Sequence, residues 1–159
     1  MRFERSMFVV ALLATVAFAA AGVHAWIVPP DLDLMRVHVL PTMVSSLLLI
    51  FPQVWVLIYL LATGRVVRRE LADGAASPAD LATSRRLRRR ALPPVALSAT
   101  AALVTVLLGF GLVSGAAEGP AHALAFVATL TLQLWALAVE WPTLRDHARL
   151  LRELEARES

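Results

Sequence analysis

The chain contains no cysteine, lysine or asparagine, and all 15 of its basic residues are arginine. Without cysteine, neither a disulfide framework nor a thiolate metal site can form. Charged residues make up only 17% of the chain, whereas hydrophobic residues reach 58% and the mean hydropathy is +0.69. Because a soluble domain is normally about 45–50% apolar, this composition excludes an ordinary soluble enzyme, a nucleic-acid-binding domain and a disulfide-bonded secreted module. It indicates a membrane protein.

The apolar residues are gathered in four long segments, at about 7–28, 39–63, 94–115 and 121–141. At 1.5 Å per residue, a helix over each segment is long enough to cross a hydrocarbon core of about 30 Å. The segments are continuous rather than alternating, which favours helices over barrel strands. We therefore predict one all-α domain over residues 1–159, a bundle of four transmembrane helices.

The arginines predict the orientation of this bundle. The connection 64–93 carries eight of them, the N-terminal flank two and the C-terminal tail four, whereas the two other connections share only Arg36. Fourteen against one is a strong positive-inside bias. We expect both termini in the cytoplasm, short extracytoplasmic loops and a location in the bacterial inner (cytoplasmic) membrane. Trp26 and Trp141 fit this topology as anchors at opposite interfaces.

The N-terminal segment has a second interpretation. Arg2, the apolar run 7–21 and the small-residue ending Val23-His24-Ala25 also resemble a cleavable signal peptide. Since the apolar run is longer than the core of a typical signal peptide, we expect a retained helix. Cleavage would remove the first helix together with His24 and leave the remaining topology unchanged.

The cytoplasmic segments are predicted to be small. Residues 64–93 form a basic loop, in which Ser77, Pro78 and Asp80 are typical of the start of a short helix that runs to the arginines at 85–90. We expect this helix to lie on anionic headgroups, where each arginine contributes about 1 kcal/mol. The tail 142–159 mixes leucines with alternating charges, which predicts an amphipathic extension of the fourth helix.

Polar residues inside a membrane tend to face the bundle interior, so their positions around each helix are informative. At 100° per residue, four polar residues of the fourth predicted helix lie within about 40° of one another: His122, Thr129, Gln133 and Glu140. The second predicted helix carries a looser polar stripe that includes Thr42, Ser45 and Gln53. We expect these stripes to meet in the interior, with a hydrogen bond between Gln53 and Gln133.

Glu140 lies near the cytoplasmic end of its predicted helix. We expect its carboxylate to reach the interface or to pair with an arginine. The alternative is a buried carboxylate that carries a proton.

Three histidines are predicted to lie at the extracytoplasmic ends of three different helices: His24, His38 and His122. Three imidazoles at matched height can bind Zn or Cu, with a carboxylate or water completing the set. Two of them, His38 and His122 first, can instead be the axial ligands of a haem b between helices. The plainer interpretation is that histidine is comfortable at the membrane interface, and no His-x-x-x-His spacing is present.

Three stretches of the chain, at 51–71, 85–109 and 132–144, resemble small, uncharacterised bacterial integral membrane proteins with four helices. The chain is also faintly similar to copper-resistance D-like membrane domains, whose histidines lie near helix ends. The sequence shows no diagnostic motif of that family, so no functional residue is transferred. The resemblance supports the four-helix topology.

The leading functional hypothesis is an accessory or scaffold subunit of a membrane complex, without catalytic activity of its own, that packs against a partner protein or a second copy. Small size, short loops and the absence of a nucleophile–base pattern favour it. The first alternative is a haem b or Cu/Zn protein that uses the extracytoplasmic histidines. The second is a small transporter or proton-conducting protein built on the polar stripe from His122 through Gln133 to Glu140.

Overall fold

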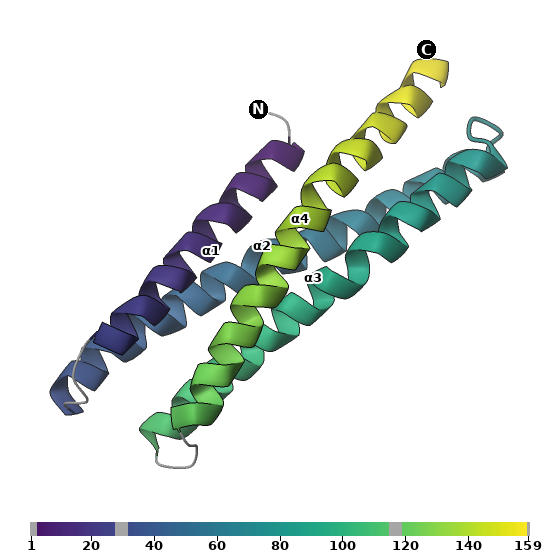
Figure 1. Cartoon of the computed structure of the whole chain (residues 1–159). Helices are drawn as coiled ribbons and strands as arrows, with labels where there is room; N and C mark the ends of the chain where they lie inside the picture. Colours follow the sequence, from purple (N-terminus) through teal and green to yellow (C-terminus); the bar gives the residue numbers. More distant parts are fainter. Residues whose placement is uncertain (1–2, 28–31, 115–118, 159) are drawn as a thin grey trace.

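The computed structural model of the chain describes residues 3–27, 32–114 and 119–158, and within these ranges it is helical throughout except at the turn that joins two of the helices and at Ser114. The helices are α1 (Phe3–Ile27), α2 (Leu32–Ala72), α3 (Pro78–Val113) and α4 (Gly119–Glu158), shown in Figure 1. Each is long and apolar enough to cross a membrane. This confirms the predicted all-helical class and four helices long and apolar enough to span a membrane.

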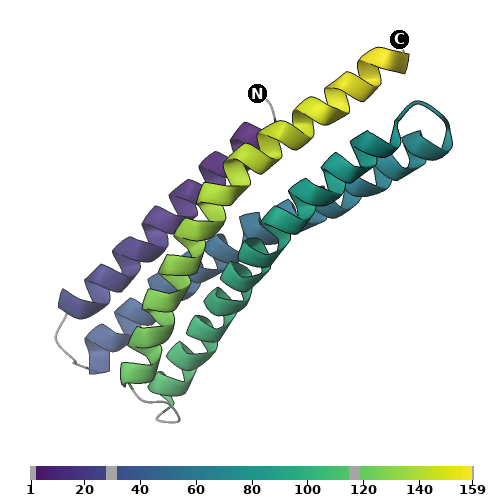
Figure 2. The same cartoon turned by 45° about the vertical axis from the view of Figure 1, so that its right-hand side comes forward.

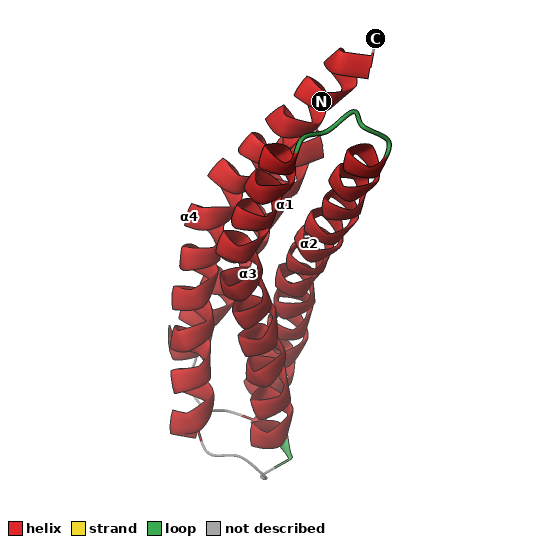
Figure 3. Cartoon of the chain, turned by 90° about the vertical axis from the view of Figure 1, so that its right-hand side faces the viewer, coloured by secondary structure: helices red, strands yellow, loops and turns green. Residues whose placement is uncertain are grey.

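The helices lie alongside one another in an elongated bundle (Figure 2). α3 packs extensively against both α2 and α4, α1 packs against α2 and α4, and α2 and α4 meet only briefly across the centre. The start of α1, the end of α4 and the turn between α2 and α3 lie at the same end of the bundle (Figure 3). The chain thus passes up and down through four neighbouring positions.

The structure replaces the predicted basic loop over 64–93 with helix. α2 continues to Ala72 and α3 begins at Pro78, so only a short turn separates them. Gly74 allows this turn because its φ of 84° lies in the left-handed region that favours glycine. At the start of α3, the Ser77 hydroxyl accepts a hydrogen bond from the backbone N–H of Asp80, and the Asp80 side chain accepts one from the backbone N–H of Ser77. This capping box satisfies backbone donors that the first helical turn leaves unpaired.

Apolar packing explains why the helices extend so far. Val67 of α2 and Ala76 of the turn are buried against Leu150 and Leu154 of α4, forming an apolar cluster of their own. The predicted tail 142–159 is accordingly helical through Glu158 and continues α4. Leu71 of α2, Leu81 of α3 and Leu151 of α4 pack against the same cluster. We call the parts of α2, α3 and α4 that surround it the three-helix extension.

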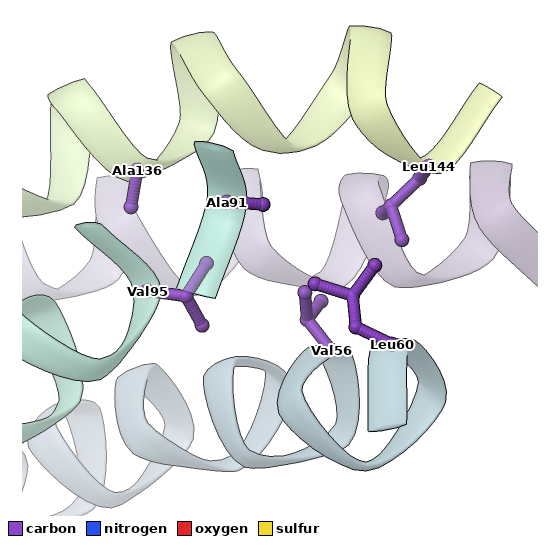
Figure 4. Packing of buried hydrophobic residues seen from close by; sticks show 6 residues of the cluster. All are labelled: Val56, Leu60, Ala91, Val95, Ala136 and Leu144. Carbon is purple, nitrogen blue, oxygen red and sulfur yellow. The ribbon is translucent and has the colours of Figure 1, made fainter. Parts of the chain in front are cut away.

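Prolines lie inside α2, α3 and α4 without ending them. The predicted third helix begins after Pro93 and Pro94, but α3 passes through both. A proline inside a helix removes a backbone hydrogen bond, and packing against neighbouring helices offsets the loss in a membrane bundle. Such packing is present around Pro93 and Pro94, where six buried apolar side chains from three helices meet (Figure 4): Val56, Leu60, Ala91, Val95, Ala136 and Leu144.

Candidate functional site: a buried polar column

The interior of the bundle is polar along much of its length because α4 turns one face inward. Thr129, Gln133 and Glu140 on this face are each 0% exposed. The polar residues of α2 differ in whether they bond within their own helix or face α4. Ser45 and Ser46 are buried but donate to the backbone carbonyl of Thr42 in their own helix, at 2.9 and 2.8 Å. Gln53 is fully buried and lies beside Glu140 on the inward face of α4.

Hydrogen bonds tie three helices together around Gln133. Its side-chain N–H donates to the Thr15 hydroxyl of α1 at 3.0 Å, and its carbonyl oxygen accepts a hydrogen bond from Ser98 of α3. Thr105 of α3 and Thr129 of α4 share a further hydrogen bond of 2.8 Å between their hydroxyls. These contacts hold the register of α1, α3 and α4, since each bond requires its two helices to be at matched height.

The predicted hydrogen bond between Gln53 and Gln133 is absent, because Gln133 bonds with Ser98 and Thr15 instead. Gln53 instead faces Glu140, which lies two helical turns beyond Gln133 on α4. The sequence places both glutamines near the middle of their helices but does not set the relative height of α2 and α4. The tertiary packing places Gln53 at the level of Glu140.

Glu140 differs from its expected role. Its side chain is 0% exposed, so it does not reach the interface. Within the described part of the chain, neither carboxylate oxygen has a hydrogen-bond partner, and no arginine forms an ion pair with it. Gln53 is the polar side chain beside it, at a geometry outside that of an ordinary hydrogen bond. Glu140 is therefore a buried, unpaired carboxyl group.

His147 is a buried polar residue that the sequence interpretation missed, because it lay in the predicted tail. The side chain is 0% exposed. Its Nε2 lies 3.2 Å from the Ser84 hydroxyl of α3, and its ring meets the Tyr59 ring of α2 edge-on, with centroids 6.1 Å apart. The seven-residue spacing that separates Gln133 from Glu140 repeats from Glu140 to His147. Extending the polar stripe past Pro142 would have found it.

Arg88 of α3 enters the same region. Its guanidinium lies against Gly64 of α2, at the place where any larger residue would put its Cβ. The charge of Arg88 acts on the His147 ring, and its Nε is buried without a hydrogen-bond partner among the described residues. Gly64 therefore allows a positive charge to approach the backbone of α2 beside a buried imidazole.

The three histidines predicted to be extracytoplasmic have different surroundings. His122 is half-buried against α3, where a Cβ built on Gly109 would lie 3.2 Å from its ring. His24 is exposed on α1, and the side chain of His38 lies outside the described residues. No group of three histidine, aspartate or glutamate side chains that could hold a metal is found among the side chains that the structure describes. A haem b or metal site at these histidines stays a prediction.

The fold and the column together define an apolar four-helix bundle of the membrane-spanning class with a buried polar interior. Comparison with known protein families, with curated proteins and with solved structures finds no match.

Proposed function

We propose that the chain is a multi-pass membrane protein without catalytic activity of its own, acting as an accessory or scaffold subunit of a membrane complex. The observation that carries this proposal is the three-helix extension, which has its own apolar cluster. A helix that only crosses the bilayer needs about 20 residues, whereas α2 has 41 and α4 has 40. The additional turns build a firm helical surface outside the membrane, on which a partner protein can dock.

We further propose that this extension is cytoplasmic and that the membrane is the bacterial inner membrane. The exposed arginines of α2 and α3 support the orientation through the positive-inside rule: Arg65, Arg68, Arg69, Arg85, Arg86, Arg89 and Arg90. Arg152 of the extension lies 3.4 Å from Glu4 of α1, which supports both termini being on that side. Arginines near the bilayer surface would contact anionic headgroups, each contributing about 1 kcal/mol.

Single-cysteine variants test the orientation directly, because the chain has no cysteine of its own. Gly119→Cys, at the opposite end of the bundle from the extension, should react with a membrane-impermeant maleimide in intact cells. Arg86→Cys on the extension should react only after permeabilisation. The reverse pattern would overturn the proposed orientation.

The same variants test the scaffold proposal. A photo-crosslinker attached at Arg86→Cys in native membranes should give one discrete protein adduct, whose mass distinguishes a second copy of the chain from another subunit. The matched control is Leu124→Cys on the apolar surface of α4, 71% exposed, which should react with lipid instead. If the extension gives no protein adduct while Leu124→Cys behaves as expected, the scaffold proposal fails.

A further inference from the structure

Several unpartnered polar atoms lie together between α2, α3 and α4, on the extension side of Gln133. They are both oxygens of Glu140, both amide atoms of Gln53, the Thr143 hydroxyl, Nδ1 of His147 and Nε of Arg88. All are buried, and within the described residues none has a hydrogen bond. Buried polar groups are nearly always paired, so an unpaired group calls for an explanation such as a bound water, an ion or a proton-transfer role.

The atoms that belong to α4 form a column along that helix. Thr143 is one turn beyond Glu140, and His147 is one turn beyond Thr143. At 1.5 Å per residue, the column from Glu140 to His147 is about 10 Å long. Thr143 and His147 are 1% and 0% exposed, so the column stays inside the packed helices over this distance. It leads from the centre of the bundle toward the three-helix extension.

The surroundings of Glu140 favour its neutral form. An ionised carboxylate is strongly destabilised when it leaves water without a cation or hydrogen-bond donors. Among the described side chains, neither a cation nor a donor in ordinary hydrogen-bond geometry satisfies Glu140, and Gln53 is a polar neighbour of its carboxyl group. A protonated carboxyl group carries one O–H donor, for which the Gln53 carbonyl oxygen is an available acceptor.

We propose that Glu140 is a proton-binding site that exchanges its proton with the aqueous phase on the extension side through Thr143 and His147. In the transfer, the O–H bond of the Glu140 carboxyl group breaks. A proton passes by way of the Thr143 hydroxyl and internal water to Nδ1 of His147. This leaves a carboxylate and an imidazolium, and the imidazolium then releases the proton on its Nε2 by way of the Ser84 hydroxyl and internal water to the aqueous phase. The reverse steps reload Glu140, so no oxidant or other reactant is consumed.

The neighbours of His147 favour the passage of a proton through its ring over stable protonation of the ring. On α3, Ser84 holds Nε2 at 3.2 Å and Arg88 places a positive charge nearby, which disfavours a long-lived imidazolium. On α2, Tyr59 faces the ring edge-on. The charges that act on Tyr59 are Glu4 of α1 and Arg152 of α4, which lie toward the aqueous end. A proton that reaches His147 therefore leaves it quickly, either to the aqueous phase on the extension side or back to Glu140.

Infrared spectroscopy of the full chain in lipid nanodiscs tests the site. At neutral pH we expect a C=O band from a protonated carboxyl group, present in the unmodified protein and lost in Glu140→Gln. The matched control is Glu155→Gln, an exposed glutamate of the same helix, which should leave the band unchanged. A protein without the band, or a band that survives in Glu140→Gln, would overturn the proposal. Loss of the band on addition of Na⁺ would do the same, because it would make a cation the occupant.

Transfer into deuterated water tests the route. The band should shift as the proton exchanges, and exchange should be slower in His147→Gln by a factor on the order of a hundred, the usual size of a positioned proton-transfer group. Thr143→Val, which nearly preserves shape, gives a second measurement in case His147→Gln does not fold. Exchange at the unmodified rate in folded variants at both positions would overturn the route through the extension side.

Discussion

The hydrogen bonds of Gln133 lead to the most quantitative prediction. Gln133→Leu keeps nearly the same side-chain volume but removes the bonds to Thr15 of α1 and Ser98 of α3. Interhelical hydrogen bonds in membrane proteins contribute about 0.6 kcal/mol on average and at most about 1.7 kcal/mol. Thr15 already donates to Ala11 in its own helix at 2.7 Å, and Ser98 can do the same with a carbonyl one turn back. The free energy of unfolding should therefore fall by about 1–2 kcal/mol.

Unfolding by sodium dodecyl sulfate in mixed micelles, followed by circular dichroism, measures this loss. A double-mutant cycle with Ser98→Ala should give a coupling energy of about 0.6–1.7 kcal/mol for the pair. Thr131→Val is the matched control, because Thr131 is exposed two residues away and bonds only within α4. If Gln133→Leu costs no more than Thr131→Val, or if the coupling energy is zero within error, Gln133 does not hold the helices in register.

Three further predictions concern packing, capping and the histidines. Gly22→Ala should destabilise the bundle by about 1–3 kcal/mol in the same assay, because its Cβ would overlap the ring of Phe126; an unchanged midpoint would show that the ring moves away freely. Ser77→Ala should cost about 1 kcal/mol through loss of the α3 cap, and Ser77→Asp should restore the stability if the cap is the cause. If the haem b or metal alternative holds, the purified protein will show a Soret band that sharpens on reduction, or near-stoichiometric Cu or Zn, and His38→Ala and His122→Ala will each remove it. A colourless, metal-free protein would dismiss that alternative.

The docking of α1 also bears on the signal-peptide interpretation. α1 buries Ala11, Thr15 and Phe18 against the other helices, and Phe18 stacks on Phe126 of α4 with ring centroids 4.8 Å apart. Removal of α1 would expose the surface of the other helices that α1 covers, and it would leave the Gln133 side-chain N–H without its acceptor on Thr15. We expect the intact mass of protein purified from membranes to include α1. A mass that corresponds to a chain starting after Ala25 would establish cleavage instead.

The sequence alone was sufficient for the helical class and for the inward placement of much of α4. Long apolar runs can satisfy their backbone groups in a membrane only as helices or closed barrels, and continuous rather than alternating runs select helices. The spacing of Thr129, Gln133 and Glu140 places them on one helix face whatever the neighbours are, because helix geometry is local. All three are buried in the structure.

Tertiary structure decided the relative heights of the helices and the extent of the column. Helices of similar composition can slide along one another without any change in local pattern, so only the packed bundle places Gln53 beside Glu140 and leaves Gln133 to Ser98 and Thr15. The same holds for His147. In sequence it belongs to a charged tail, and it becomes a buried residue only because α2 and α3 continue past the apolar segments and cover that face of α4. Local periodicity determines which residues share a face, and contacts between distant segments determine what that face meets.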